Sequence, residues 1–336
     1  MQNIYQPNQE TYLKAKALFE SDEVLAFPTE TIYGLGANAL SDTAAEKIFA
    51  LKGRPNDNPL IVHVGNKHQI SEYAEIENGI QQVIIDKLMP GPITLLLKKR
   101  DIISSVVCNV PYVGIRIPAN QIAQELLTTV GLPIAAPSAN ISGKASPTTA
   151  AMVYDNLGER IPMIIDGGES EAGIESSVVQ VIFKDEKYTI LILRPGFVTK
   201  EDLEACFEGE IEVHYSQKNP ELSPGMRYKH YSIGGEVRIF SSLEEIRLEK
   251  SKKIGVLATQ EFLLDHQEFF AQQAGNFLIQ ERGTYQNLAT CAHNLFEKYH
   301  YFDMEGVDIL YVEQLPEQGI GYSIMNRVKR SAEQHS

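Results

Sequence analysis

The sequence predicts a protein of the α/β class with two domains, and three observations carry this prediction. Short apolar runs alternate with amphipathic stretches through the first part of the chain, as expected when buried strands alternate with helices. The pattern stops near Gly209, and Ser216–Gly225 has little periodicity and two prolines, which is typical of a linker. A second, shorter α/β pattern begins at Glu236. The expected boundaries are 1–208 for the first domain, 209–235 for the linker and 236–336 for the second domain.

The individual elements follow from hydrophobic spacing. A helix is expected at Asn8–Glu20, because its apolar residues fall on one stripe. Apolar runs predict strands of the first domain at Val24–Phe27, Leu60–Val64, Thr94–Leu97, Val113–Ile117, Leu132–Ala136, Met163–Ile165, Ser177–Ile182 and Thr189–Leu193. In the second domain the same criteria predict strands at Val237–Phe240, Ile254–Leu257 and Val307–Val312, and helices at Tyr285–Phe302 and Gly321–Lys329.

Composition excludes several classes of protein. The chain has 336 residues and a formal net charge of −14, which argues against broad nucleic-acid binding because that needs a basic face. Its three cysteines are scattered, as expected of reduced thiols in a cytoplasmic protein. The start has no signal-peptide pattern, and no apolar run approaches the about 20 residues that span a bilayer. The histidines lack paired-ligand spacing, so no protein-held metal is expected.

The segment Ser138–Pro147 is the most informative part of the chain. It follows the apolar run at Leu132–Ala136, and its Ser, Asn and Gly residues indicate a turn rich in exposed donors. Pro147 is expected to open a helix with Ser146 as the N-cap. Donor-rich turns beside a helix N-terminus bind anions, because amides and the helix dipole both face the ligand. The alternative is a plain connection between a strand and a helix.

Cationic side chains stand at three other places where an anion would explain them. Lys52 and Arg54 lie two residues apart in a Gly/Pro loop, so both side chains can face one phosphate; the alternative is a solvated basic turn. Arg116 lies within an apolar strand and Arg194 ends another, and a buried arginine needs a carboxylate from the protein or an anionic ligand. His63 also lies on an apolar strand, where a satisfied core histidine is the alternative.

Two loops complete the set of polar motifs. Pro28–Gly36 places hydroxyls, a carboxylate and a phenol just after a strand, where α/β proteins bind ligands. Its glycines do not form a dinucleotide fingerprint, because polar residues separate them from the strand. Asp166–Ser177 is Gly-rich and acidic, and is a flexible surface loop, a lid or a metal-assisting loop. No P-loop, nucleophile elbow, redox motif or general base is evident, so the residues alone indicate an anion- or nucleotide-binding α/β enzyme that works by positioning and charge neutralisation.

Taken together, these motifs resemble the threonylcarbamoyl-AMP synthase family in its long form, over nearly the whole chain. The resemblance implies a YrdC-like N-terminal domain, with a twisted mixed sheet and a concave positively charged pocket, and a smaller Rossmann-like α/β C-terminal domain. The linker would cover the site as a lid. The residues that carry the resemblance are Pro28–Gly36, Lys52–His63, Pro90–Thr94, Val113–Pro118, Ala136–Gly143, Gly173–Val178, Leu193–Gly196 and Ser223–Tyr231.

The resemblance implies that L-threonine, bicarbonate and ATP give L-threonylcarbamoyl-AMP and pyrophosphate, with Mg²⁺ held mainly by the ATP phosphates. A partner transferase would then modify adenosine 37 of tRNAs. Lys52 and Arg54 would be catalytic. By position, the threonine contacts would be Thr31, His63, Arg116, Ala136 and Ser176, and the ATP contacts would be Arg54, Asn58, Tyr112, Ser138, Ser146, Arg194 and Tyr231.

One departure and two rival functions remain open. Tyr112 stands where relatives often carry a small Thr, which matters only if its side chain meets ATP. One rival is an enzyme that makes carbamoyl-AMP for carbamoyl transfer, although such proteins are expected to carry extra domains. The other rival is a non-catalytic RNA-binding module, which the net charge of −14 opposes.

Overall fold

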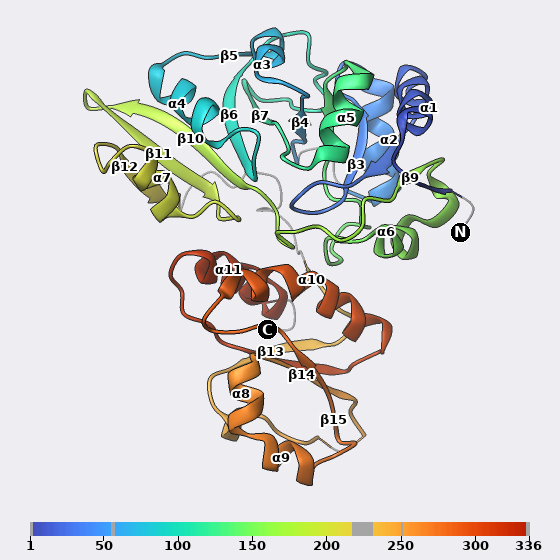
Figure 1. The fold of residues 1–336 in the computed structure, drawn as a ribbon, viewed down its shortest axis with the longest axis vertical. Coiled ribbons are helices and arrows are strands. Elements are labelled where there is room, and N and C mark those ends of the chain that lie inside the picture. The colour runs from blue at the N-terminus through green and yellow to red at the C-terminus, as the bar shows by residue number, and fades with distance from the viewer. Residues whose placement is uncertain (1–2, 55–57, 217–230, 250, 334–336) are drawn as a thin grey trace. The chain divides into compact units, whose positions relative to one another are not determined.

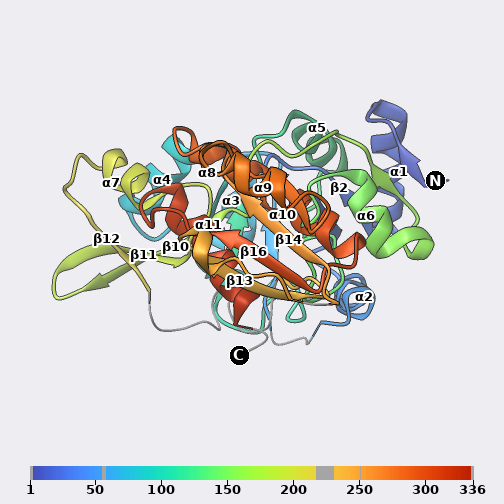
Figure 2. The same cartoon turned by 90° about the horizontal axis from the view of Figure 1, so that it is seen from below.

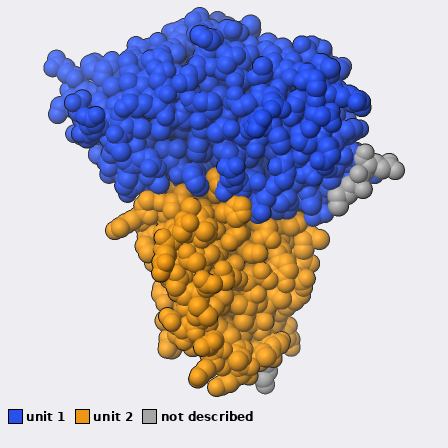
Figure 3. Space-filling view, in the orientation of Figure 1, with its two compact units in different colours: residues 1–142, 147–171, 175–228 blue, residues 143–146, 172–174, 229–336 orange. Residues whose placement is uncertain are grey.

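The computed structural model describes residues 3–54, 58–216, 231–249 and 251–333. The chain forms two compact units, coloured separately in Figure 3. The first comprises 1–142, 147–171 and 175–228, and the second comprises 143–146, 172–174 and 229–336. The second unit therefore includes two short segments, 143–146 and 172–174, that lie between parts of the first unit in the sequence. The segment 217–230, which holds most of the predicted lid, lies outside the described residues.

The first unit is built on one mixed sheet of 12 strands (Figure 1). Neighbouring strands pair in parallel at β4–β7 and antiparallel at β6–β7 and β10–β11, which agrees with the predicted mixed-sheet class. In spatial order the strands are β1 (Ile4–Tyr5), β9 (Ile164–Ile165), β2 (Leu25–Phe27), β3 (Gly34–Asn38), β8 (Ile134–Ala135), β4 (Ile61–His63), β7 (Tyr112–Arg116), β6 (Ile93–Lys99), β10 (Ser177–Lys184), β11 (Lys187–Arg194) and β12 (Glu212–Tyr215), with β5 (Ala74–Glu75) beside β6.

Helices of the first unit begin at clear capping residues. The helix α2 starts after Ser41, whose side chain accepts from the Ala44 amide, and ends at Gly53, which has a positive φ of 61°. This stop places Lys52 as the last helical residue. The helices are α1 (Gln9–Glu20), α2 (Asp42–Lys52), α3 (Lys67–Tyr73), α4 (Gly79–Leu88), α5 (Gln121–Val130), α6 (Ala150–Leu157) and α7 (Lys200–Cys206), with the 3-10 turn η1 (Gly158–Arg160) after α6.

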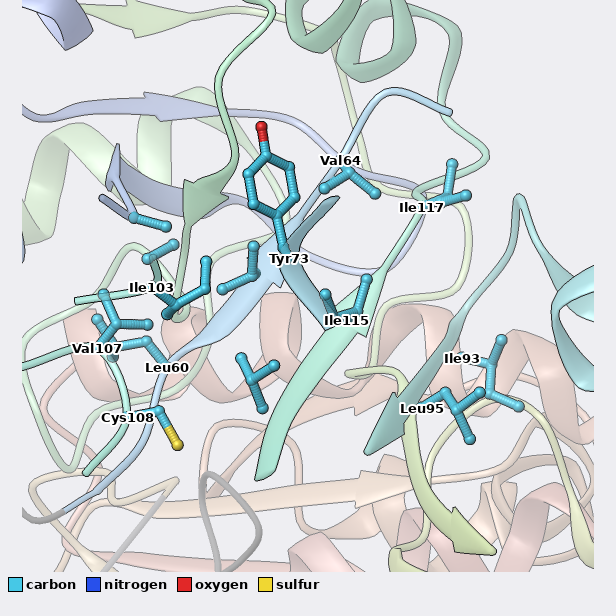
Figure 4. Close-up of a cluster of buried hydrophobic side chains, with 14 of the residues drawn as sticks. Leu60, Val64, Tyr73, Ile93, Leu95, Ile103, Val107, Cys108, Ile115 and Ile117 are labelled. Carbon is cyan, nitrogen blue, oxygen red and sulfur yellow. The ribbon is translucent and has the colours of Figure 1, made fainter. Parts of the chain in front are cut away.

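The central strands divide their side chains between two faces of the sheet. Alternate residues such as Val62, Leu95 and Ile115 pack into the main hydrophobic core, part of which Figure 4 shows. Residues of the opposite parity form a smaller apolar cluster of Ile61, Leu96, Val178 and Leu193. The predicted site residues His63 and Arg116 have the parity of Ile61, so they lie on this second face.

The second unit is a parallel sheet with helices on both faces, which confirms the Rossmann-like prediction (Figure 2). On one face Val256 and Phe240 pack with α8 and α9, and on the other Gly255 leaves space for Phe302 of α10. The strand order is β13 (Glu236–Phe240), β16 (Ile309–Glu313), β14 (Ile254–Ala258) and β15 (Phe277–Glu281). The helices are α8 (Gln260–Asp265), α9 (Gln267–Gln272), α10 (Leu288–Met304) and α11 (Ile320–Ala332), with the 3-10 turn η3 (Leu243–Glu245) after β13.

The structure departs from the sequence predictions at a few points. The N-cap of α6 is Thr149, whose side chain accepts from the Met152 amide, so the prediction of Ser146 as the cap is wrong. Strands β3 and β15 were not predicted, because β3 carries two glycines and β15 lacks a long apolar run. Within the segment assigned to the linker, Glu212–Tyr215 forms β12 beside β11. In the part of the chain that the structure describes, no helix is long and apolar enough to cross a membrane.

Candidate functional site

Arg116, one of the predicted threonine contacts, forms a buried ion pair with Glu30. Arg116 ends β7, and its Nη2 lies 2.8 Å from Oε1 of Glu30, with both side chains under one-tenth exposed. A buried arginine needs a carboxylate from the protein or an anionic ligand, and Glu30 is that carboxylate. The pairing is incomplete, because Nε of Arg116 has no hydrogen-bond partner among the described residues. A buried guanidinium with an unmet donor is suited to bind a further anion.

His63 stands beside Arg116 in the sheet. The two residues are direct partners in the β4–β7 register, so their side chains lie on the same face. Burial lowers the pKa of His63 to about 3, and the charge of Arg116 adds to the shift, so the imidazole is neutral at physiological pH. Its Nδ1 has no hydrogen-bond partner among the described residues. A neutral imidazole with a free nitrogen can take part in a hydrogen bond with a hydroxyl group of a ligand.

Thr31 lies in the loop between β2 and β3 and is fully buried. Its hydroxyl is 2.9 Å from the hydroxyl of Thr29, which also donates to the carbonyl of Ile32 at 2.6 Å. Backbone amides of Thr31 and Ile32 point at the Thr29 oxygen in turn, each at 3.2 Å. The loop is therefore rigidly cross-linked, and Thr29 fixes where the Thr31 hydroxyl points.

Ser176 joins the predicted threonine and ATP contacts. Its hydroxyl is 2.8 Å from that of Thr94, and Nη2 of Arg194 donates to both its carbonyl and its hydroxyl, at 2.9 and 3.1 Å. Arg194 reaches this position because the β10–β11 register shifts at Val178, which then lies opposite Arg194. A bulge of this kind re-aims a side chain across the sheet. Here it brings Arg194, predicted to contact ATP, against the residue predicted to contact threonine.

Lys52 holds the turn that the sequence analysis singled out. Its amino group donates to the carbonyls of Ser138 and Asn140, at 2.5 and 2.6 Å, and its own carbonyl accepts from the Ser142 amide at 2.8 Å. The pKa of Lys52 lies well below its usual range because burial disfavours the charged form and Arg54 adds repulsion. Ser138 is also bridged to Gly34 in β3. The donor-rich turn is thus anchored from both sides.

Arg54 and Asn58 flank three residues that the structure leaves undescribed. Arg54 Nη2 donates to the carbonyl of Asn58 at 3.0 Å and to that of Pro59 at 3.3 Å. Asn58 is fully buried, yet neither Oδ1 nor Nδ2 has a hydrogen-bond partner among the described residues. Because buried amides are normally satisfied, this side chain indicates a place for a polar ligand.

The remaining predicted contacts are Ala136, Tyr112, Ser146 and Tyr231. Ala136 is buried, and its amide donates to the carbonyl of Ile61 at 2.8 Å. Tyr112 is half-buried, and its carbonyl accepts from the thiol of Cys108. Ser146 and Tyr231 belong to the second unit, where the Tyr231 ring stacks on Phe296 of α10 with centroids 5.1 Å apart. Their roles stay predictions.

Sequence reasoning missed three residues that orient this site: Glu30, Thr29 and Thr94. Glu30 and Thr29 lie inside the quoted motif Pro28–Gly36, and Thr94 ends the motif Pro90–Thr94. The available signal was a carboxylate beside Thr31 in a loop that follows a strand, where α/β proteins bind ligands. The sequence did not show that this loop meets the end of β7, where Glu30 pairs with Arg116.

Two family models cover the chain. Residues 17–196 match the model described as "Telomere recombination", and residues 198–333 match the model described as "Threonylcarbamoyl-AMP synthase, C-terminal domain". A Bacillus subtilis relative named threonylcarbamoyl-AMP synthase is 38% identical, with 97% of this chain and 94% of the relative covered. The chain belongs to the threonylcarbamoyl-AMP synthase family. As the second model indicates, it is of the long form with the C-terminal domain, as the sequence motifs predicted.

Other members of the threonylcarbamoyl-AMP synthase family agree over the same length. The Pyrococcus abyssi synthase is 34% identical over 95% of this chain and 93% of its own. The Schizosaccharomyces pombe synthase is 33% identical over 95% of this chain and 87% of its own. The crystal structure of the P. abyssi protein Sua5 complexed with L-threonine superposes with a TM-score of 0.86 and 33% identity, covering 98% of this chain and 97% of that one. The fold prediction is therefore confirmed.

Proposed function

We propose that this chain is a threonylcarbamoyl-AMP synthase, a nucleotidyltransferase that converts L-threonine, bicarbonate and ATP to L-threonylcarbamoyl-AMP and pyrophosphate. Full-length similarity to synthases from bacteria, archaea and eukaryotes supports the reaction. The single observation in the structure that supports it is the pair of neighbouring buried residues Arg116 and His63, each with a side-chain nitrogen that no described residue satisfies and that a polar ligand would.

The threonine end of the site is assigned to one face of the sheet. Arg116 would bind the α-carboxylate through Nε, the donor that no described residue uses. Neutral His63 and the buried hydroxyl of Thr31 would hold the threonine hydroxyl. Ser176 and Ala136 would complete the contacts. Support comes from the L-threonine complex of the P. abyssi relative, which shares this fold.

The ATP end is assigned to the turn around Ser138 and to the residues that fix it. Asn58 and Tyr112 complete the nucleotide contacts proposed within the first unit, and the roles of Ser146 and Tyr231 in ATP binding stay predictions. We propose that Arg54 and Arg194 neutralise phosphate charge. We also propose that Lys52 contributes positive charge from its place against the Ser138 turn. Lys52 holds two carbonyls there, and an arriving polyphosphate would favour its charged form again.

The reaction would proceed by attack of a carbamate on ATP. The carbamate formed from the threonine amine and bicarbonate would attack the α-phosphorus, and pyrophosphate would leave. Arg54 and Lys52 would stabilise the developing negative charge. The described residues contain no group of three or more His, Cys, Asp or Glu side chains able to hold a metal. As the family resemblance implies, Mg²⁺ would be held mainly by the ATP phosphates, where it would supply further charge neutralisation.

The cellular context follows from the same proposal. The product would pass to a transferase that modifies adenosine 37 of tRNAs, in the cytoplasm. No stable binding of nucleic acid is expected from a chain with a net charge of −14.

Pyrophosphate release tests the proposed reaction. The purified chain is incubated with ATP and magnesium, with L-threonine and bicarbonate omitted in turn. Release that needs both co-substrates is expected. Release supported by carbamoyl phosphate instead would favour the carbamoyl-transfer rival. Salt-dependent RNA binding without any release would favour the RNA-binding module.

A further inference from the structure

The carboxylate of Glu30 makes few hydrogen bonds with the described residues although it is paired with Arg116. Oε1 of Glu30 lies 2.8 Å from Nη2 of Arg116, within ion-pair distance, but no hydrogen bond of acceptable geometry reaches either atom from the described residues. From the residues that the structure describes, the other oxygen accepts a single long contact, of 3.4 Å, from the Asn120 amide. Glu30 is about as buried as Arg116, at 6% and 3% exposed. A buried carboxylate in this condition has acceptor capacity left for a ligand.

The position of Glu30 opposes binding of a simple anion. A carboxylate beside Arg116 cancels part of the attraction that the guanidinium exerts on an incoming carboxylate. An α-amino acid removes this conflict, because it carries a carboxylate and an ammonium group on one carbon atom. With the substrate carboxylate on Arg116, the ammonium group lies within reach of Glu30. The pair is therefore complementary to a zwitterion.

Resting on the proposed function, we propose that Glu30 binds the α-ammonium group of threonine and accepts its proton. In this step the N–H bond to one ammonium proton breaks and an O–H bond forms on Glu30. The free amine nitrogen then bonds to the carbon of bicarbonate. The hydroxyl of bicarbonate leaves as water, taking one of the two protons that remain on the nitrogen. The balance is threonine ammonium, bicarbonate and Glu30 carboxylate giving carbamate, water and protonated Glu30. This assigns the base that the sequence left unidentified.

The ligand test compares L-threonine with (R)-3-hydroxybutanoate, which lacks only the amino group. Binding of both to the whole chain is measured by calorimetry. The wild-type protein is expected to prefer threonine, and Glu30→Gln is expected to reduce that preference about tenfold to hundredfold. The matched control is Glu175→Gln, since Glu175 is equally buried, at 6% exposed, and adjoins Ser176. That control is expected to keep the preference.

Two outcomes overturn the proposal. In the first, Glu30→Gln keeps the full preference for threonine over the analogue. In the second, Glu175→Gln loses this preference while Glu30→Gln keeps it. If Glu30→Gln fails to fold, Glu30→Asp is used, because it keeps the carboxylate and shortens its reach. Glu30→Asp must then weaken the binding of threonine more than the binding of the analogue. Failure of the proposed function is distinguishable, because the wild-type chain would then release no pyrophosphate with threonine and bicarbonate.

The proton-transfer part is tested by turnover at saturating threonine. Loss of a general base costs about a hundredfold to ten-thousandfold in rate, so kcat must fall in Glu30→Ala even when threonine is saturating. Acetate should restore part of that kcat by occupying the place of the missing carboxylate, while leaving wild-type turnover unchanged. An unchanged kcat in Glu30→Ala would limit Glu30 to binding and would refute the proton transfer.

Discussion

Replacing Arg116 by Met should affect two separable properties of this protein. Arg116 and Glu30 have side chains only 4% and 8% exposed, so their interaction is little screened by water. Removing one partner of a buried pair leaves an uncompensated charge, which costs about 3–5 kcal/mol of folding free energy. The same change removes the proposed carboxylate contact, which should weaken threonine binding about tenfold to a few hundredfold, since a hydrogen bond to a charged group contributes roughly 1.5–3 kcal/mol.

A double-mutant cycle separates the two effects. Adding Glu30→Gln to Arg116→Met removes the stranded charge, so most of the lost stability should return, whereas threonine binding should not. Stability is followed by chemical denaturation with far-UV circular dichroism, because the chain has no Trp for fluorescence. Binding is followed by calorimetry. The reasoning is refuted if Arg116→Met costs less than about 1 kcal/mol, or if the double variant is no more stable than the single one.

Three further predictions concern neighbouring residues. Lys52→Met should reduce turnover by orders of magnitude and speed hydrogen exchange in the turn, because two carbonyls lose their donor; unchanged steady-state kinetics would contradict this. Since the pKa of His63 falls from 6.5 to about 3 on folding, its stabilisation is complete above pH 6.5 and is lost as pH falls; unfolding measured at about pH 7.5 and about pH 5.5 should differ by about 1.4 kcal/mol more in wild type than in His63→Asn. Gly196→Ala would place Cβ 2.2 Å from the Ser177 amide, so it should destabilise the first unit by about 1–3 kcal/mol and raise the KM for threonine.

Each of these predictions has a matched control within the same unit. Lys47→Met alters an exposed lysine on the same helix as Lys52 and should leave turnover unchanged. His68→Asn makes the same substitution at an exposed histidine of the same unit. Gly79→Ala adds a Cβ that meets nothing within 4 Å and should not destabilise the protein. Controls that behave like the test variants would show a general loss of folding instead of a local effect.

Strands of the first unit were predictable because burial on both faces makes them apolar. Thr94–Leu97 and Val113–Ile117 were found within two residues of their observed ends for this reason. Strand β3 was missed because Gly34 and Gly36 gave it the composition of a turn. The structure explains Gly36, since a Cβ there would lie 2.8 Å from Ile134 and 2.9 Å from Phe27. The glycine permits close packing inside a sheet.

The chemistry of the site was only partly predictable from the sequence. An arginine inside an apolar strand requires a partner, so Arg116 stood out from local sequence alone. Its partner Glu30 did not, because the pairing depends on how a distant loop meets β7. The approach of Arg194 to Ser176 depends on a single bulge in the β10–β11 register, which no local pattern encodes. The sequence indicated candidate functional groups, and the long-range register decides which of these candidates meet.

The mass of the nucleotide product tests the central claim most directly. The whole chain is incubated with ATP, magnesium, L-threonine and bicarbonate, with the carbon of bicarbonate or the nitrogen of threonine isotopically labelled. The account predicts a product with the mass of threonylcarbamoyl-AMP, formed together with pyrophosphate. This product takes up the bicarbonate label in one experiment and the threonine label in the other. A nucleotide product that takes up the bicarbonate label without the threonine label would contradict it.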